Sequence, residues 1–194
     1  MKVPAEFDEI RPYSPEELPA VFNELLADEQ FMQVALSMLG GMPKEQFKAA
    51  LLSCQTNLEV QKTFFYPLLK QLLAKCSAGC DMNAEALADK NQQYTFISNH
   101  RDIVLDSALL SVMLVDNNFP TTVEIAIGDN LLIYPWIKKL VRINKSFIVQ
   151  RSLSMREMLA SSMRMSKYMH FAVREKGENI WIAQREGRAK DSND

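Results

Sequence analysis

The sequence predicts an α/β fold in which a mainly parallel sheet is flanked by helices and preceded by an all-helical segment. Residues 1–90 show amphipathic helical patterns, whereas short β-like runs alternate with helical patterns after Asn91. The 194 residues are 47% apolar and 24% charged, ordinary globular values that allow a substantial core. The predicted units are a helical N-terminal segment at residues 1–90 and an α/β domain at residues 91–194.

Capping and helix-breaking residues divide the first unit into four helices. Residues 1–13 are expected to form a loose leader. The stretch that begins at Ser14 then supplies a capping serine, a proline at the first helical position and acids in the first turn. Helices are expected at 14–26, 28–39, 43–54 and 56–76, with a kink at Pro67 and a short helical turn at 83–90. No catalytic pattern is visible here, so we interpret this unit as a cap on the catalytic domain or a lead-in to it.

Four strand-like runs and three helical patterns make up the second unit. Strands are expected at 94–98, 123–127, 146–150 and 180–183, and helices at 106–115, 130–141 and 153–175. This alternation is typical of parallel strands joined by crossover helices. The chain stops soon after the charged turn that follows the fourth run. We therefore expect the sequence to be the front part of a longer protein, with the second unit incomplete at its C-terminal end.

Charge and cysteine content narrow the class of protein. The first unit carries 8 Lys/Arg against 13 Asp/Glu, and the second carries 14 against 11. A basic second half suits an anionic substrate or an anionic membrane surface, although scattered solvated side chains would give the same counts. The net charge of the whole chain, −2, does not suggest a nucleic-acid partner. The chain has an odd number of cysteines (Cys54, Cys76 and Cys80) and no signal peptide, which indicates a reducing compartment. Cys76 and Cys80 have the spacing of a possible metal-binding pair, but no second Cys/His pair stands nearby, so we interpret them as structural. The sequence contains no apolar run of about 18 residues, so it predicts no transmembrane helix.

The first of three blocks with candidate chemistry is centred on His100, one of two histidines in the chain. It stands where a strand gives way to a helix, and Asp102 and Asp106 follow it. A neutral imidazole takes a proton from an alcohol when a carboxylate holds its other nitrogen, so His100 is a candidate general base. In the alternative interpretation Asp102 caps the helix and His100 is incidental. The His-Arg-Asp letters also match a protein-kinase loop, but Ser107 stands where the kinase asparagine is needed and no Gly-rich loop precedes it.

Two further blocks offer cations at the ends of predicted strands. Arg151 follows the third strand, and its planar guanidinium is suited to phosphate. Glu186-Gly187-Arg188 and Lys190 follow the fourth strand, where glycine permits a tight turn and the two basic residues would face an anion. Taken singly, each block is also what an ordinary surface turn looks like. Together the three blocks offer a base and two cationic clamps at the edge where parallel sheets form binding crevices, as acyl transfer from a thioester to a phosphorylated alcohol requires.

In this order the blocks resemble the motifs of the glycerolipid acyltransferase family, the glycerol-3-phosphate and 1-acylglycerol-3-phosphate acyltransferases. The family's first motif is His, four residues, then Asp; its second ends in a strand with an arginine; its third contains Glu-Gly followed by basic residues. The resemblance covers about residues 94–190. It implies that His100 deprotonates the acceptor hydroxyl with an aspartate as its partner, and that Arg151 binds the acceptor phosphate. The resemblance matches Glu186 and Gly187 to the core of the third motif, among the substrate-binding residues, and it implies that Arg188 and Lys190 lie near that phosphate.

The sequence departs from the family pattern in three places. Leu105 stands at the position of the family's aspartate, so the partner is either Asp106, which we favour, or Asp102. Arg185 stands where many members have proline, which is nearer the glycerol-3-phosphate type and leaves the acceptor open. The family's fourth motif is absent, in agreement with truncation.

The resemblance implies an O-acyltransferase of phospholipid biosynthesis. The donor would be acyl-CoA or acyl-carrier protein and the acceptor a glycerol-phosphate or lysophospholipid, with no metal, no further cofactor and no covalent acyl-enzyme. A non-catalytic lipid- or membrane-binding module of the same fold and an acyltransferase for a lyso-aminolipid are the alternatives. Residues 130–139 combine aromatic, aliphatic and lysine side chains, which suits a membrane interface or an amphipathic core helix. The expected location is cytoplasmic, peripheral on the inner face of the cell membrane.

Overall fold

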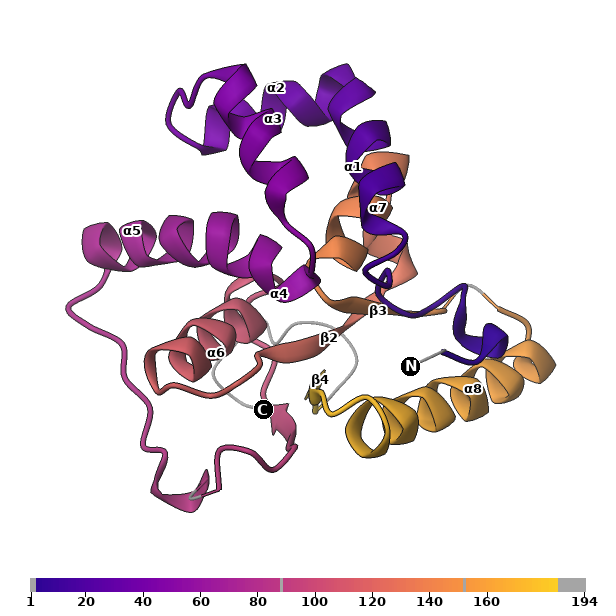
Figure 1. Cartoon of the computed structure of the whole chain (residues 1–194). Coiled ribbons are helices and arrows are strands. Elements are labelled where there is room, and N and C mark those ends of the chain that lie inside the picture. Colours follow the sequence, from indigo (N-terminus) through magenta and orange to yellow (C-terminus); the bar gives the residue numbers. More distant parts are fainter. Residues whose placement is uncertain (1–2, 88, 152, 185–194) are drawn as a thin grey trace.

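Four parallel strands form one sheet in the described part of the chain (Figure 1). The structure is a computed structural model and describes residues 3–87, 89–151 and 153–184. The strands are β1 (Thr95–Ser98), β2 (Val123–Gly128), β3 (Ser146–Val149) and β4 (Asn179–Ala183), in the order β1-β4-β2-β3 across the sheet. The predicted parallel sheet is confirmed, and all four carboxyl ends lie at one edge.

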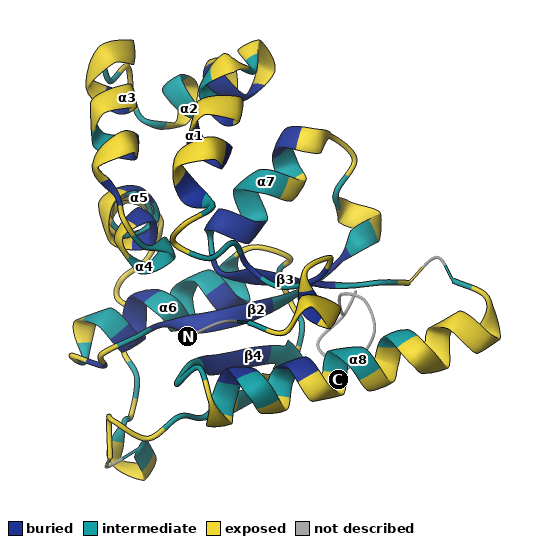
Figure 2. Cartoon of the chain, turned by 45° about the vertical axis from the view of Figure 1, so that its right-hand side comes forward, coloured by how far each residue is buried: buried dark blue, intermediate teal, exposed yellow. Residues whose placement is uncertain are grey.

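Helices cover both faces of the sheet, as predicted (Figure 2). On one face α8 (Met155–Arg174) packs against the sheet, with Tyr168 and Ile180 in one buried cluster. On the other face α6 (Leu105–Asp116) places Leu114 in a cluster with Trp181. Because Ile180 and Trp181 are neighbours on β4, their side chains point to opposite faces, so α8 and α6 lie on opposite sides.

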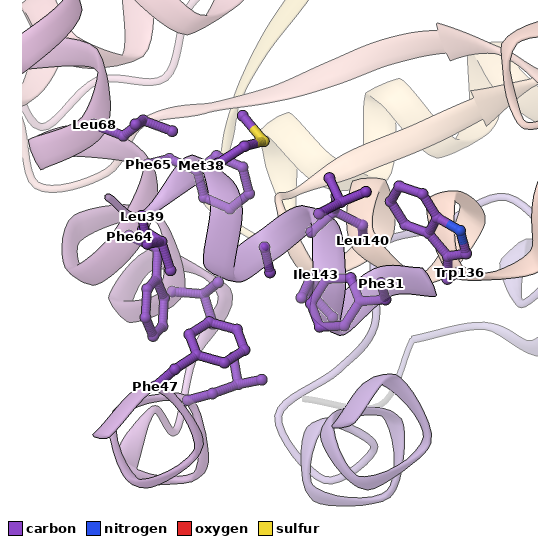
Figure 3. Close-up of a pocket in the computed structure, with 14 residues that line it drawn as sticks. Phe31, Met38, Leu39, Phe47, Phe64, Phe65, Leu68, Trp136, Leu140 and Ile143 are labelled. Carbon is purple, nitrogen blue, oxygen red and sulfur yellow. The ribbon is translucent and has the colours of Figure 1, made fainter. Parts of the chain in front are cut away.

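The helical N-terminal segment packs on α7 (Pro135–Ile143). Its helices are α1 (Leu18–Ala27), α2 (Glu29–Met38), α3 (Lys44–Ser53), α4 (Asn57–Val60) and α5 (Tyr66–Cys76), with a π-helical turn at Gln61–Phe65 between the last two. Trp136 and Ile143 of α7 belong to the same buried cluster as Phe22 and Phe47 of this segment. An apolar cavity of about 90 Å³ lies between α2, α3, α5 and α7 (Figure 3). The segment and the α/β part therefore share a core.

Two amides of the helical segment complete the C-terminal end of α7. Nδ2 of Asn57 donates to the carbonyls of Arg142 and Ile143, at 3.1 Å each. Nε2 of Gln61 donates to the carbonyl of Asn144 at 3.2 Å. The last carbonyls of a helix have no partner within it, so these long-range contacts supply the missing donors.

The N-terminal residues pack against the sheet, so the expectation of a loose leader at 1–13 was wrong. Phe7 and Ile10 are only 3% and 2% exposed. The amide of Ile148 in β3 donates to the carbonyl of Ile10 at 2.8 Å, so the segment covers the outer edge of β3. The sequence pattern missed this because the apolar side chains that pack, chiefly Phe7 and Ile10, are scattered among charged residues and show no helix or strand periodicity.

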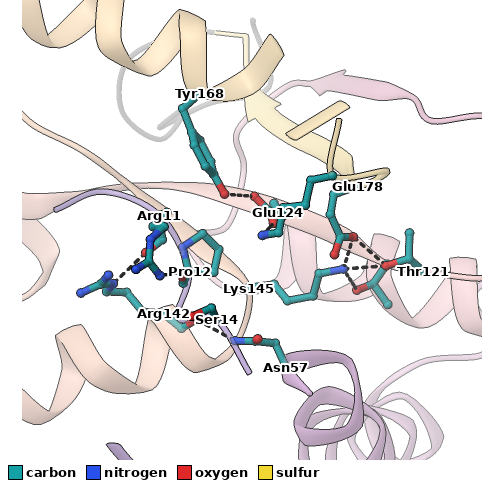
Figure 4. Close-up of polar contacts among 12 residues, drawn as sticks. Arg11, Pro12, Ser14, Asn57, Thr121, Glu124, Arg142, Lys145, Tyr168 and Glu178 are labelled. Atoms are coloured by element: carbon teal, nitrogen blue, oxygen red, sulfur yellow. Dashed lines mark hydrogen bonds and ion pairs between the residues drawn. The ribbon is translucent and has the colours of Figure 1, made fainter. Parts of the chain in front are cut away.

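Arg142, a residue of α7, binds the backbone of this N-terminal segment through its guanidinium group (Figure 4). Its Nε donates to the carbonyl of Arg11 and its Nη2 to the carbonyl of Asp8, both at 2.8 Å. The guanidinium carbon lies 4.0 Å from the centroid of the Tyr13 ring. A cation that is 8% exposed thus has carbonyl acceptors and an aromatic face around it, as burial of a charge requires.

Two expected helix starts and one expected helix kink differ in the structure. The first helix begins at Leu18 rather than near Ser14. The helix expected at 130–141 begins only at Pro135, because the fixed φ of proline suits the first helical position. The kink expected at Pro67 is a π-helical turn just before it, where a wider turn accommodates the missing proline amide.

Buried ionic contacts hold the sheet at the ends where its strands begin (Figure 4). Glu124, fully buried near the start of β2, accepts hydrogen bonds from the Tyr168 hydroxyl, at 2.5 Å, and from Lys176. Nζ of Lys145, just before β3, lies 2.7 Å from Oε2 of Glu178, just before β4. Burial and the Glu124 carboxylate raise the pKa of Tyr168 well above its usual value. These contacts lie at the opposite end of the sheet from His100 and serve the fold.

Candidate active site

The candidate residues follow the carboxyl ends of the strands. His100 follows β1, Asp129 follows β2 and Arg151 follows β3. β1 and β3 are the outer strands, with β4 and β2 between them. At about 4.8 Å per strand spacing, the ends of β1 and β3 are about 14 Å apart. The sheet therefore brings the first two predicted blocks to one edge but does not place them in contact.

His100 and Asp106 form a hydrogen-bonded pair. Nδ1 of His100 lies 3.0 Å from Oδ2 of Asp106. The same oxygen accepts the backbone amides of Arg101, at 2.8 Å, and of Asp102, at 3.1 Å. The side chains of the pair are 15% and 17% exposed, so both are shielded but can still be reached from solvent. Asp106, which the sequence analysis favoured as the partner, is thus the carboxylate that faces His100.

Asp102 has a different place in the same turn. Its Oδ1 accepts the amides of Val104 and Leu105, at 2.8 Å each, and closes the turn that leads into α6. Leu105, at the position of the family's aspartate, is the first residue of α6. The helix-capping interpretation therefore describes Asp102, while His100 is held by Asp106.

The contact with Asp106 determines which ring nitrogen of His100 carries the proton. A carboxylate can only accept hydrogen bonds, so Nδ1 of His100 must be the protonated nitrogen. In the neutral ring Nε2 then keeps its lone pair, which is the form that accepts a proton from a hydroxyl. Asp106 also lies in the first turn of α6, where the helix dipole favours a negative charge. The arrangement is chemically that of an oriented general base.

Trp181 on β4 supports the His100 ring and was not among the predicted site residues. The two rings meet edge to face, with centroids 6.0 Å apart and an interplanar angle of 69°. Nε1 of Trp181 donates to Oγ of Ser98 at 3.0 Å, at the end of β1. Trp181 is 3% exposed and so forms a fixed wall beside the imidazole. Only the pairing of β1 with β4 brings these positions together, so no local pattern could have identified this residue.

The Arg151 side chain reaches across β2 toward the centre of the edge. A Cβ built on Gly128, the last residue of β2, would lie 2.9 Å from Nε and 3.3 Å from Cδ of Arg151. The side chain therefore lies on Gly128, one strand closer to His100 than β3 itself. The Arg151 backbone amide donates to Oδ1 of Asp129 at 3.2 Å and joins the two loops. Gly128, which the sequence analysis did not single out, permits this close approach.

The third predicted block lies outside the described residues. It comprises Glu186, Gly187, Arg188 and Lys190, with Arg185 before it. Within the described ranges, no group of three or more His, Cys, Asp or Glu side chains is arranged to hold a metal ion. Cys54 is buried, and Cys76 and Cys80 are exposed.

The segment 130–139 divides between core and surface. Trp136 is 9% exposed, and its Nε1 donates to Oε1 of Gln30 at 3.0 Å. Ile133 and Tyr134, just before α7, are 72% and 43% exposed. The core interpretation describes α7, and the loop before it presents its apolar side chains to solvent. No helix in the described part of the chain combines the length and apolarity needed to cross a bilayer.

A family model connects the chain with known proteins. The model, described as Acyltransferase, matches residues 81–192, which is more than half of the 194 residues. A search of curated proteins finds no match. The matched range contains all four strands of the sheet, the pair of His100 and Asp106, and Arg151.

Proposed function

The chain belongs to the glycerolipid acyltransferase family, and on that premise we propose that it moves a fatty acyl group from a thioester donor to the hydroxyl of a glycerol-phosphate or lysophospholipid acceptor. The observation that carries the proposal is the 3.0 Å contact between Nδ1 of His100 and Oδ2 of Asp106. That contact supports a general base whose other nitrogen can face a hydroxyl group.

The proposed reaction begins with removal of a proton. Nε2 of His100 takes the proton of the acceptor hydroxyl while the hydroxyl oxygen attacks the thioester carbonyl carbon. The carboxylate of Asp106 stabilises the imidazolium that results. When the tetrahedral intermediate collapses, the carbon–sulfur bond breaks and the imidazolium returns the proton to the leaving thiolate. The acyl group passes directly from sulfur to oxygen without an acyl-enzyme.

The acceptor phosphate is assigned to cations at the same edge of the sheet. Arg151 supports this assignment because its side chain lies over Gly128, toward the centre of the edge, and a guanidinium fork suits two phosphate oxygens. Glu186, Gly187, Arg188 and Lys190 follow β4, the strand next to β1. Arg188 and Lys190 are assigned to the same phosphate, and Glu186 and Gly187 to the substrate site as the core of the third motif. The proposed donor is acyl-CoA or acyl-carrier protein. The proposed setting is phospholipid biosynthesis in the cytoplasm, with peripheral contact to the inner face of the cell membrane.

Substitutions of the pair test this proposal in the full protein. Initial rates are measured with glycerol-3-phosphate and its 1-acyl form, side by side, with each donor. His100→Ala is expected to lower kcat by about 100- to 10,000-fold. Asp106→Asn is expected to lower kcat more than Asp102→Asn, because Oδ2 of Asp106 contacts the imidazole whereas Oδ1 of Asp102 accepts backbone amides. Wild-type turnover in a folded His100→Ala variant would refute the role of the base.

A non-catalytic lipid- or membrane-binding module of the same fold is the second candidate. Leu105 at the position of the family's aspartate motivates it, and the contact of Asp106 with His100 favours the enzyme. Lipid binding without turnover, for any donor and acceptor pair, would support the module. Turnover with a lyso-aminolipid alone would change the acceptor and leave the base in place.

A further inference from the structure

A cavity of about 90 Å³ lies between the helical N-terminal segment and α7 (Figure 3). Every described residue that lines it is apolar, and these residues belong to α2, α3, α4, the π-helical turn, α5 and α7. The aromatic members are Phe31, Phe47, Phe64, Phe65 and Trp136. The described lining includes no residue of β1, of α6 or of the loop between them. The cavity is therefore a feature of the helical segment and α7, and the residues of the candidate base take no part in it.

The chemistry of the lining favours an apolar ligand over water. A buried water molecule needs about two to four polar partners. The one polar side-chain group among the described lining residues is the indole nitrogen of Trp136, which already donates to Oε1 of Gln30 at 3.0 Å. A cavity of about 150 Å³ lined by Leu, Ile and Phe binds benzene, so a cavity of this size takes a small apolar group or the end of a hydrocarbon chain.

The cavity reaches from the surface of α2 into the core. Val34 and Met38, one helical turn apart on α2, are 38% and 59% exposed, whereas Phe47 and Val60 are 3% and 1% exposed. Figure 3 shows the side chains of Met38 and Phe47 at opposite ends of the labelled group. A ligand that enters beside Met38 thus has its inner end in the core and its outer end in solvent. A single alkyl chain with a polar head group has this shape, and the flexible side chain of methionine adapts to it.

The cavity and the candidate active site are two separate places in the fold. None of the described lining residues is an acid, a base or a nucleophile, so the cavity is suited to binding and not to a reaction. The 194 residues include two tryptophans, one at each place. Trp136 lines the cavity, and Trp181 forms the wall beside His100. Each place therefore has its own fluorescent reporter.

We propose that this cavity binds one alkyl chain at a site separate from His100. The chain belongs to a free fatty acid, an acyl thioester or a lysophospholipid, and its head group stays in solvent beside Met38. Because α2, α3 and α5 lie on one side of the cavity and Trp136 of α7 on the other, a bound chain adds contacts between the helical segment and the α/β part. Binding therefore stabilises the folded protein. The site does not depend on the proposed acyl transfer, since it is built without the residues of the base.

Tryptophan fluorescence of the protein tests this site. Trp181→Phe leaves Trp136 as the only tryptophan of the 194 residues, and its emission is expected to shift when a chain enters the cavity. The first probes are the straight-chain alcohols from 1-butanol to 1-octanol. Affinity should rise about fourfold with each methylene group and level off once the chain fills the cavity, and the melting temperature should rise with occupancy. Decanoate, decanoyl-CoA and 1-decanoyl-glycerol-3-phosphate then show which head group the opening accepts.

Variants that fill the cavity supply matched controls in the Trp181→Phe background. Ala35→Leu adds three carbons to the lining, and Val34→Phe narrows the opening at the surface. Both are expected to abolish the emission shift of Trp136. Ala20→Leu makes the same chemical change as Ala35→Leu at an exposed position of α1, and it is expected to bind the probes as its parent does.

Three results would overturn the proposal. The first is unchanged Trp136 emission and an unchanged melting temperature with every probe. The second is an undiminished shift in both Ala35→Leu and Val34→Phe, after thermal melts have established that they fold. The third is a response of Trp181 in a Trp136→Phe variant with no response of Trp136 in its counterpart, which would place the chain at His100 alone. His100→Ala should lose turnover and keep the Trp136 shift, so failure of this site and failure of the proposed function are distinguishable.

Discussion

Replacing Gly128 by alanine is expected to weaken binding of a phosphorylated acceptor without weakening the fold. Gly128 has φ −70° and ψ 136°, ordinary extended backbone for any residue, so an added Cβ brings no backbone strain. Reduced flexibility of the unfolded chain would by itself stabilise the protein by about 0.4–1 kcal/mol. The damage is therefore confined to the side chains that the new methyl group meets.

The size of the effect follows from two distances. The alanine Cβ would lie 2.5 Å from Oδ1 of Asn130 and 2.9 Å from Nε of Arg151. Carbon in van der Waals contact with another heavy atom needs about 3.5 Å, so the Arg151 side chain must shift by about half an ångström and lose its place over β2. A charged hydrogen-bonded contact contributes about 1.5–3 kcal/mol. Its loss would raise the KM for the acceptor by about 10- to 150-fold.

Steady-state kinetics with glycerol-3-phosphate and its 1-acyl form measure this effect. KM should rise while kcat stays within a few-fold of wild type, because His100 and Asp106 stand two strands away from β2. Arg151→Lys keeps the charge and loses the planar fork, so it should raise KM in the same direction. Thermal melts supply the stability control. An unchanged KM in both variants, with melting temperatures at the wild-type value, would refute the role of Arg151 in phosphate binding.

Two further predictions concern stability. Asn57→Ala removes two donors from the end of α7 and is expected to lower the free energy of unfolding by about 1–3 kcal/mol in urea titrations. Asn23→Ala, which removes an amide donor at an exposed position of α1, should stay within about 0.5 kcal/mol of wild type. Equal losses in the two variants would contradict the capping role of Asn57. Burial opposes ionisation of Glu17, but hydrogen bonds from Arg11 and Ser14 outweigh it and lower its pKa from 4.5 to about 2. Because the folded-state pKa is the lower one, the advantage of wild type over Glu17→Gln should be complete above pH 4.5 and vanish toward pH 2; a difference that stays constant over that range contradicts it.

Much of the fold could be predicted because it depends on neighbours within a few positions. The helix expected at 28–39 is α2, which begins at Glu29 because Asp28 caps it, with Oδ1 of Asp28 accepting the Phe31 amide at 2.9 Å. The strand-like runs match β1 to β4 to within one residue at each end, since each is a short run rich in β-branched and aromatic residues between turn-forming residues. The same local signal placed His100 after a strand and before a helix. These features need no knowledge of distant partners.

Distant partners account for most of what the sequence analysis missed. The order β1-β4-β2-β3 puts two strands between His100 and Arg151, and no motif spacing contains that information. Trp181 stands beside His100 only because β4 pairs with β1. Asn57 caps a helix that ends 86 residues later, at Ile143. Each of these roles depends on which elements pack together, which a single sequence does not reveal.

Asp106 lies one residue later than the aspartate of the family motif, and it shows that the number of residues between two motif positions is only an indirect measure of the distance between their side chains. A shift of one residue along a helix turns a side chain by about 100°, which would take Asp106 away from His100 if the loop kept a fixed shape. The loop instead wraps around the carboxylate, because Oδ2 of Asp106 accepts the Arg101 and Asp102 amides as well as Nδ1 of His100. The position of the imidazole is thus set relative to the carboxylate oxygen rather than by the number of residues between them. With Leu105 as the first residue of α6 and Asp106 as the second, the carboxylate lies in the first helical turn, within reach of the loop amides. An extra residue in this turn is therefore compatible with the same pair of groups and the same chemistry.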